Sequence, residues 1–398
     1  MRVIHVTTVP QSLGFLRGQT AFMRTRGFEL SFVSAPGDAL ERFAATEEAR
    51  VFAVPMERRI TPLRDLAALR RLWAHFRRER PDVVHAHTPK GGLLGTIAAA
   101  LAGVPVRIYH MRGLPLMGAS GARRTLLTLT EMVSCGLATE VLCVSHSLRG
   151  VALDLGLTDP DKIQVLLRGS GQGVDTEGRF NPATHAAQRE RVRHSWGVPS
   201  SGLVFGFVGR IVRDKGVHEL ARAWARIRDA HPQAHLVIVG PFEDQDPVDD
   251  AVREALRSDE RAHLVGSSDD PARLYAAMDV VVLPTYREGF PNVPLEAMSM
   301  ALPVIATRIP GCVDAVEDGV TGILVPPKTV APLFEAMDRY ARSEALRREH
   351  GHSGRMRARE FFRRERIWQA LSEAYEAALR LPVHPGGEQR RRAEVSRG

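Results

Sequence analysis

Short apolar runs rich in Val, Ile and Leu alternate with longer segments of helical periodicity along the whole chain. Such runs are typical of strands buried on both faces, and their alternation with helices is typical of βαβ units. The strands predicted in the first half are Val3–Thr7, Leu30–Val33, Val51–Val54, Val83–His85, Val106–His110, Val141–Val144 and Ile163–Leu166. Those predicted in the second half are Val204–Val208, His235–Val239, His263–Val265, Val280–Leu283, Val304–Ala306 and Gly322–Val325. The pattern therefore predicts an α/β protein with two doubly wound units and parallel sheets.

A polar segment separates the two halves. It runs from Asn181 to Gly202, reads NPATHAAQRERVRHSWGVPSSG and ends in a cluster of Pro, Ser and Gly. A chain of 398 residues is too long for one ordinary α/β domain and suits two of roughly 180 residues each. We predict an N-terminal domain over residues 1–190 and a C-terminal domain over residues 199–360.

The last apolar periodicity covers Phe361 to Leu381 and predicts one amphipathic helix, placed at residues 361–382. This helix either crosses back onto the first domain or remains the last helix of the second, and the pattern leaves both placements open. Residues 383–398 have too little apolar content to order them, so we expect a disordered tail.

Two carboxylates flank a predicted junction between a buried strand and a helix. Glu288 follows the run Val280–Leu283, and Glu296 lies about one turn inside a helix that can begin near Asn292. Such a junction in an open α/β sheet binds anions, because free N–H groups and the helix dipole point toward the ligand. Carboxylates beside it accept hydrogen bonds from hydroxyls, so we expect a ligand that is both phosphorylated and polyhydroxylated.

A second motif, FVGRIVRDKGVHEL, follows the first predicted strand of the second half. It places Arg210 and Lys215 beside a turn that leads into a helix. A bidentate Arg and a point-charge Lys can stabilise the charge of a departing diphosphate without a metal. Alone the string is also consistent with a solvated turn, but its pairing with the two carboxylates favours a ligand site.

The segment EGFPNVPLEAMSMALPVIAT resembles the donor-binding signature of the family 4 retaining glycosyltransferases. The resemblance implies the GT-B fold, in which two Rossmann-like domains face each other across a cleft. It also implies that Glu288 meets hydroxyls of the donor sugar and that Glu296 binds the nucleotide ribose. Ala301 stands where the family often has Gly, and we expect this small change to be tolerated.

The same resemblance extends to the residues around these carboxylates and to the cation motif. Arg210 and Lys215 match the diphosphate-binding pair of the family, so the resemblance implies catalytic roles for both, for Glu288 and for His110. The implied donor-binding set is Gly14, Gly209, Arg210, Lys215, Glu288, Gly289, Phe290, Pro291, Asn292, Val293 and Glu296.

In the first half, Gly14 stands in the loop after the first predicted strand, where the family usually has a Gly pair. A glycine at a tight turn is the alternative. His110 ends the strand Val106–His110 and resembles the family histidine that reaches the donor sugar, although a lone histidine at a strand end is more often structural.

Other predicted strand ends of the first half carry candidates for binding the acceptor. The segment HTPKGG offers His87, Lys90 and Gly91, which could bind an acceptor phosphate, and Arg112 is a further candidate. The segment LRGSGQGVDTEGRF resembles a family segment that would line the floor of the cleft from Ser170 to Val174. A connecting turn explains its glycines equally well.

The net charge of +8 is concentrated in the first half of the chain. Residues 1–198 hold 26 Lys and Arg against 17 Asp and Glu, whereas the remainder holds 28 against 29. In the helix predicted from ITPLRDLAALRRLWAHFRRERPD, an apolar stripe of Leu66, Leu69, Trp73 and Phe76 is flanked by arginines. Either the stripe packs on the sheet and the arginines are solvated, or the helix rests on an anionic membrane.

Several sequence features argue against secreted, membrane-spanning and nucleic-acid-binding classes of protein. The three cysteines lack disulfide or metal-ligand spacing, and neither a membrane span nor a leader peptide is expected, which fits a cytoplasmic protein. Basic stretches lack a nucleic-acid-binding module, and aromatic content is only 6%. No Asp-x-Asp occurs at a predicted strand end, so we expect no metal and no cofactor.

We therefore predict a retaining, metal-independent glycosyltransferase of polysaccharide or glycan biosynthesis. Its expected partners are a nucleotide-sugar donor, best matched by a UDP-sugar, and a saccharide acceptor, free or linked to polyprenyl diphosphate. It would work in the cytoplasm or at the inner face of the membrane. A nucleotide-sugar epimerase of the same fold is the alternative enzyme, and a basic nucleic-acid-binding protein is a remote one.

Overall fold

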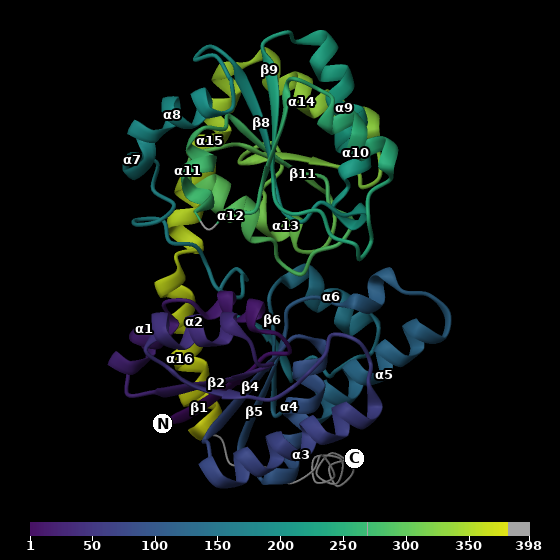
Figure 1. Ribbon diagram of the computed structural model, residues 1–398. Coiled ribbons are helices and arrows are strands. Elements are labelled where there is room, and N and C mark those ends of the chain that lie inside the picture. Colours follow the sequence, from purple (N-terminus) through teal and green to yellow (C-terminus); the bar gives the residue numbers. More distant parts are fainter. Residues whose placement is uncertain (269, 381–398) are drawn as a thin grey trace, which may run out of the picture. The chain divides into compact units, whose positions relative to one another are not determined.

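Two parallel sheets organise the computed structural model, which describes residues 1–268 and 270–380 (Figure 1). The seven-stranded sheet has the order β3-β2-β1-β4-β5-β6-β7, and the six-stranded sheet has the order β10-β9-β8-β11-β12-β13. Strand order reverses between β1 and β4 in the first sheet and between β8 and β11 in the second. These are the switch points at which doubly wound sheets bind ligands.

Each strand predicted from the apolar pattern is present, with ends that differ by one or two residues. The strands are β1 Arg2–Val6, β2 Glu29–Ser34, β3 Arg50–Ala53, β4 Val83–His87, β5 Val106–Met111, β6 Glu140–Cys143, β7 Ile163–Val165, β8 Leu203–Val208, β9 Ala234–Val239, β10 Ala262–Gly266, β11 Val280–Leu283, β12 Val304–Thr307 and β13 Gly322–Val325. Strands β4, β9, β11 and β12 are buried along their whole length, as strands covered by helices on both faces should be.

The α-helices between these strands supply the crossovers. They are α1 Gln19–Thr25, α2 Asp38–Glu47, α3 Pro62–Glu79, α4 Pro89–Ala102, α5 Gly121–Leu137, α6 His146–Asp154, α7 Pro182–His185, α8 Arg189–Ser195, α9 Val217–Ala230, α10 Asp250–Arg257, α11 Pro271–Ala276, α12 Asn292–Ser299, α13 Cys312–Ala315, α14 Val330–Arg342, α15 Glu344–Phe361 and α16 Arg364–Arg380. Short 3₁₀ turns occur at η1 Pro10–Leu16, η2 Pro115–Gly118, η3 Ala186–Gln188 and η4 Arg213–Lys215.

The chain divides into two compact units. The first contains Met1–His110, Thr130–Val141 and the described residues from Gln369 onward, and the second contains Met111–Leu129 and Leu142–Trp368. The first sheet ends with β7 and the second begins its chain with β8. The compact units follow different limits, so the ranges 1–190 and 199–360 stay a prediction. The tail at 383–398 and the last two residues of the predicted C-terminal helix lie outside the described residues.

The polar segment after Asn181 is not an irregular linker. It forms α7, η3 and α8, and two of its arginines pair with Asp279, which immediately precedes β11. Arg189 and Arg193 each lie 2.6 Å from a carboxylate oxygen of Asp279, and Arg193 is almost fully buried. These paired charges tether the segment, because leaving Asp279 unpaired in that setting would be costly.

The C-terminal helix begins later than predicted. Phe361 ends α15 and α16 starts at Arg364, because the backbone between them pairs with Val174 instead of continuing the helical bonds. Val174 N donates to Phe362 O at 2.8 Å, and Arg364 N donates to Val174 O at 3.2 Å. Residues of α16 from Gln369 onward belong to the first unit.

The apolar stripe predicted for α3 is partly wrong. Ala68, Leu72, His75 and Phe76 are buried, whereas Leu66 and Trp73 are 56% and 43% exposed. The buried face is therefore rotated from the predicted one, and the helix keeps an apolar surface among its arginines. Within residues 1–268 and 270–380, no helix has both the length and the apolar content that crossing a bilayer needs.

Ala301 ends α12 with φ of +59°, in the left-handed region that favours glycine. This conformation suits the Gly that the family resemblance implies at this position. We expect Ala301→Gly to raise the free energy of unfolding by about 1 kcal/mol, since a left-handed L-residue costs about 1–2 kcal/mol and glycine costs some chain entropy. Urea titration would measure it. In the exposed interior of α3, Ala67→Gly should instead lower stability, and equal effects at both sites would contradict the argument.

Glu131 of α5 is buried, and it accepts a 2.6 Å hydrogen bond from the Tyr109 hydroxyl. Burial raises the pKa of Glu131 to about 7, and the tyrosine bond opposes that shift. Because the folded pKa exceeds the unfolded value, this group's contribution to stability is complete below about pH 4.5 and is lost as pH rises to about 7. We expect wild type to lose up to about 3 kcal/mol relative to Glu131→Gln over this interval. Urea titrations of both proteins from pH 4.5 to 7.5 would check it, and a constant difference would refute it.

Candidate active site

Two loops meet at the switch point of the second sheet. One follows β8 and carries the cation motif, and the other follows β11 and carries Glu288. Tyr286 N donates to Asp214 O at 2.8 Å, and Arg287 Nη2 lies 2.9 Å from the Asp214 carboxylate. Asp214 therefore joins the loops through both its backbone and its side chain.

Lys215 and Glu288 form an ion pair across this junction. Their side chains are 18% and 15% exposed, so water screens the pair only in part. The two residues stand 73 positions apart in sequence and come from the two motifs that predicted phosphate and hydroxyl binding. The structure thus brings both kinds of ligand-binding group to one point.

The cation loop depends on two close backbone approaches. Gly216 has φ of +70° and precedes α9, and a Cβ on it would lie 2.0 Å from Pro284 O. At Gly240, a Cβ would lie 1.8 Å from Gly209 O. Side chains at these positions would push the loop away from the sheet, so the glycines fix where the two cations lie.

Arg210 is half-exposed and lies 2.7 Å from a Glu243 carboxylate oxygen. An exposed ion pair of this kind contributes about 0–1 kcal/mol. The guanidinium can therefore exchange Glu243 for a phosphate at little cost. No motif pointed to Glu243, which lies in a polar loop after β9.

Glu296 lies in α12, which begins at Asn292 as predicted. Its carboxylate accepts a 2.8 Å hydrogen bond from the Tyr275 hydroxyl. Burial raises the pKa of Glu296, and the tyrosine bond opposes this. Tyr275, which the motifs did not predict, holds the carboxylate that the resemblance assigns to the ribose.

The backbone of the Glu288 loop is fixed on several sides. A Cβ on Gly289 would lie 2.0 Å from Arg112 O, and the Ser145 hydroxyl donates to Gly289 O at 2.8 Å. The Phe290 ring packs 5.6 Å from the Phe362 ring, so this predicted donor-binding side chain supports the loop. Pro291 is buried, and Asn292 and Val293 are partly buried.

Arg112 is the acceptor candidate that the structure places beside the donor loop. Its backbone contacts Gly289, and its Nη2 donates to Gly171 O at 3.3 Å. The segment from Ser170 to Val174 serves as a connecting turn, because Gly173, with φ of +67°, packs against Arg364. Its proposed place on a cleft floor stays a prediction.

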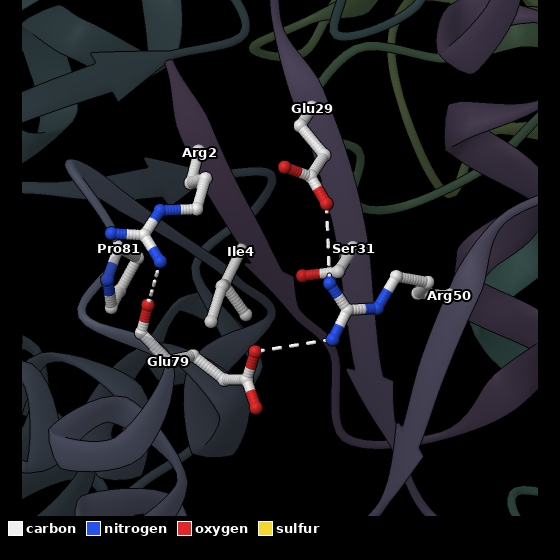
Figure 2. A pocket seen from close by; sticks show the side chains of 7 residues that line it. All are labelled: Arg2, Ile4, Glu29, Ser31, Arg50, Glu79 and Pro81. Carbon is white, nitrogen blue, oxygen red and sulfur yellow. Dashed lines mark hydrogen bonds and ion pairs between the residues drawn. The ribbon is translucent and has the colours of Figure 1, made fainter.

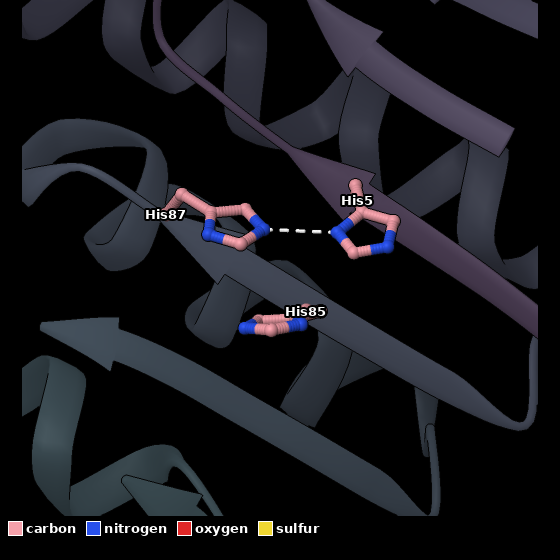
Figure 3. A group of neighbouring side chains, drawn as sticks. All are labelled: His5, His85 and His87. Atoms are coloured by element: carbon pink, nitrogen blue, oxygen red, sulfur yellow. Dashed lines mark hydrogen bonds between the residues drawn. The ribbon is translucent and has the colours of Figure 1, made fainter. Parts of the chain in front are cut away.

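His87 and His110 belong to a buried histidine cluster at the switch point of the first sheet. His5, His85 and His87 bring ring nitrogens within 4.8 Å of one another (Figure 3). His5 Nδ1 lies 2.9 Å from His87 Nε2, and His85 bonds through both nitrogens, to His110 Nδ1 at 3.1 Å and to the Tyr375 hydroxyl at 2.6 Å. These hydrogen bonds occupy ring nitrogens that a cation would need as ligands. The cluster is therefore interpreted as a hydrogen-bonded one.

Lys90 and Gly91, proposed for an acceptor phosphate, have internal partners. Lys90 lies 2.8 Å from the Asp65 carboxylate, and Gly91 N donates to the Thr8 hydroxyl at 2.9 Å. The adjacent Thr88 has φ of +66°, which is unusual for a β-branched residue. These contacts hold the start of α4 against β1, and a ligand role at Lys90 or Gly91 stays a prediction.

Gly14 lies within the 3₁₀ turn η1, where a Cβ would have open space around it. Its φ is not left-handed, so the backbone conformation at this position does not require glycine. Open space is what a backbone approached by a ligand would show, but the donor role of Gly14 stays a prediction.

A small pocket lies at the end of the first sheet where its strands begin, and charged residues line it (Figure 2). Arg2, Glu29 and Arg50 lie at the starts of β1, β2 and β3, away from the strand ends that bind ligands. Arg50 pairs with Glu29 at 3.1 Å and with Glu79 at 3.2 Å. These charges satisfy one another, so the pocket is a structural ion network.

Two Rossmann-like units, with cations and carboxylates at the second switch point, define a protein of the GT-B glycosyltransferase class. The family description "Glycosyl transferases group 1" matches residues 202–343, and "Glycosyl transferase 4-like domain" matches residues 15–169. The chain belongs to this family, and its enzymatic class is glycosyltransferase. The relatives below are transferases, so the epimerase alternative is not favoured.

Relatives are similar over most of the chain. The Staphylococcus aureus capsular polysaccharide biosynthesis glycosyltransferase CapM is 33% identical over 379 residues, covering 95% of this chain and 98% of that protein. The Escherichia coli UDP-Gal:alpha-D-GlcNAc-diphosphoundecaprenol alpha-1,3-galactosyltransferase is 27% identical, covering 87% and 89%. The crystal structure of Anabaena HepE with UDP-glucose superposes with a TM-score of 0.78 at 20% identity, covering 95% of this chain and 100% of that one. This last similarity concerns the fold.

Proposed function

We propose that the protein transfers a sugar from a UDP-sugar to a saccharide carried on polyprenyl diphosphate, with retention at the anomeric carbon and without a metal. The observation that carries the proposal is the contact of Lys215 with Glu288 at the second switch point, with Arg210 on the same loop. Two relatives support the substrates, because one transfers galactose from UDP-Gal to a diphosphoundecaprenol-linked sugar and another is a glycosyltransferase of capsular polysaccharide biosynthesis.

In the proposed mechanism, the donor diphosphate displaces Glu288 from Lys215 and Glu243 from Arg210. The two cations then stabilise the negative charge that develops as the bond from the anomeric carbon to the diphosphate breaks. Glu288, released from Lys215, accepts hydrogen bonds from the donor sugar, and Glu296 binds the ribose. His110 is assigned to the donor sugar by the family resemblance.

The acceptor hydroxyl attacks from the face that the diphosphate leaves. Its oxygen forms the new bond to the anomeric carbon, and its proton passes to the departing diphosphate oxygen. Catalysis then rests on positioning and electrostatics, and no protein nucleophile is required. Arg112 is the proposed acceptor contact, because its backbone adjoins the donor loop at Gly289.

The test is a panel of nucleotide sugars assayed by mass spectrometry for donor hydrolysis and transfer. We expect turnover of a UDP-sugar, unchanged by EDTA, and losses of about 100-fold in kcat/KM for Arg210→Ala and Lys215→Met. Arg213→Ala is the matched control, because this arginine of the same loop pairs with Asp249 at 2.7 Å and should stay within about two-fold. Loss of turnover in EDTA that manganese restores, or unchanged donor use in both cation variants, would refute the proposal.

We also propose that α3 holds the protein on anionic lipid, at the cytoplasmic face of the membrane where a lipid-linked acceptor is available. Leu63 is 86% exposed, and with Leu66 and Trp73 it forms an apolar surface on this helix. Exposed arginines at 70, 71, 77 and 78 flank it. Apolar and aromatic side chains beside basic ones suit the interface of an anionic bilayer.

Flotation with vesicles tests this membrane contact. The protein should float with phosphatidylglycerol vesicles and not with phosphatidylcholine vesicles, because each Lys or Arg near an anionic surface contributes about 1 kcal/mol. Changing Arg70, Arg71, Arg77 and Arg78 together to Glu should abolish flotation. A variant with the same charge change at four exposed arginines of the second unit, Arg222, Arg257, Arg339 and Arg348, should still float. Equal flotation of both variants, or no dependence on anionic lipid, would disprove the contact.

A further inference from the structure

A buried chain of hydrogen bonds connects the C-terminal helix to His110. The Tyr375 hydroxyl of α16 lies 2.6 Å from His85 Nδ1, and His85 Nε2 lies 3.1 Å from His110 Nδ1. We propose that Tyr375 and His85 are positioning residues that fix the ring orientation and the tautomer of His110. The proposal rests on the proposed function only for the role of His110 toward the donor sugar.

The direction of this chain follows from the groups that form it. An imidazole nitrogen is a better acceptor than a phenol oxygen, so the tyrosine O–H donates to His85 Nδ1. His85 then carries its proton on Nε2 and donates it to His110 Nδ1. A neutral His110 must carry its own proton on Nε2, and this nitrogen becomes a hydrogen-bond donor.

The surroundings favour one fixed arrangement. Tyr375 and His85 are fully buried and His110 is nearly so, so the hydrogen bonds form where solvent does not compete. The rings of His85 and His110 stack with centroids 5.1 Å apart and 8° between their planes. Tyr375 also packs edge-on against Phe28 of the first unit, at 5.7 Å.

The register of the sheet explains why His85 can reach His110. β4 and β5 are parallel neighbours in which His85 pairs with Ile108 and His87 pairs with His110. Residues two apart on a strand share a face, so His85, His87 and His110 all lie on one face of the sheet. α16 supplies the tyrosine to this face, which gives the helix a task beyond packing.

A donor N–H at His110 Nε2 suits the sugar hydroxyl that the resemblance assigns to this residue. If His110 carried its proton on Nδ1, it would present an acceptor at Nε2 instead of a donor. The Tyr375–His85 pair therefore sets which kind of hydrogen bond His110 offers.

The test combines imidazole NMR with kinetics on Tyr375→Phe, which removes one hydroxyl and keeps the ring. In ¹⁵N-histidine spectra of the ligand-free full-length protein, wild-type His110 should be the Nε2–H tautomer throughout pH 6–8. In Tyr375→Phe it should become a mixture of tautomers. The kcat/KM for the donor should fall about ten-fold or more, because a reacting group loses its fixed geometry, while the affinity for UDP alone should hold.

Tyr340→Phe is the matched control. Tyr340 is also buried, and its hydroxyl lies 2.7 Å from His350 Nδ1 in the second unit. This variant loses the same kind of tyrosine–histidine bond, so it should lose similar stability and leave the His110 tautomer and the kcat/KM within about two-fold of wild type.

The outcomes separate this proposal from the proposed function. If wild type turns over a UDP-sugar and Tyr375→Phe matches Tyr340→Phe in both spectrum and kinetics, the positioning role is overturned and the function stands. If the tautomer shifts in Tyr375→Phe but wild type uses no nucleotide sugar, the hydrogen-bond chain is supported and the function fails. Stoichiometric zinc in the purified protein, lost in His87→Asn, would also overturn the positioning role.

Discussion

The bonds between the loops after β8 and β11 are the constraint on which the second unit's site depends. A cation motif and a carboxylate motif 73 residues apart act together only if their loops share a fixed geometry. Asp214 supplies that geometry by accepting hydrogen bonds from Tyr286 and Arg287, and Gly216 allows the backbone approach it requires. Without ligand, Lys215 and Glu288 neutralise each other, so the unit does not carry an uncompensated charge into a partly buried place.

The negative and the positive side chains of this site are suited to different parts of a ligand. Carboxylates are suited to accepting hydrogen bonds from hydroxyls, whereas guanidinium and ammonium groups stabilise a developing diphosphate. In the proposed mechanism, the ion pair breaks when the donor binds, and the cost is recovered because each partner gains a ligand group of suitable charge. A site that can exchange partners in this way binds its substrate without leaving either charge buried alone in the free protein.

In the first unit, burial determines how the polar side chains at the switch point are paired. Four histidines, at positions 5, 85, 87 and 110, lie on one face around the switch point, and each is buried. Buried ring nitrogens need hydrogen-bond partners, and here several of them bond with one another or with a hydroxyl. Tyr375 provides that hydroxyl, so a helix from the far end of the chain takes part in the hydrogen bonding of His85 on β4.

The sequence alone determined the strands, both switch-point motifs and the start of α12, because strand composition and loop–helix signals are local. The tertiary structure decided what depends on neighbours distant in sequence. It paired Lys215 with Glu288 and Arg210 with Glu243, it ended α15 before Arg364 through bonds to Val174, and it rotated the buried face of α3 so that Trp73 is exposed. His85 and His87 lie two residues apart on one strand, but the link of His85 to Tyr375 could not be read from spacing. The periodicity of a helix shows that one face is apolar. Which residues are buried also depends on the elements that pack against the helix, and those are known only from the fold.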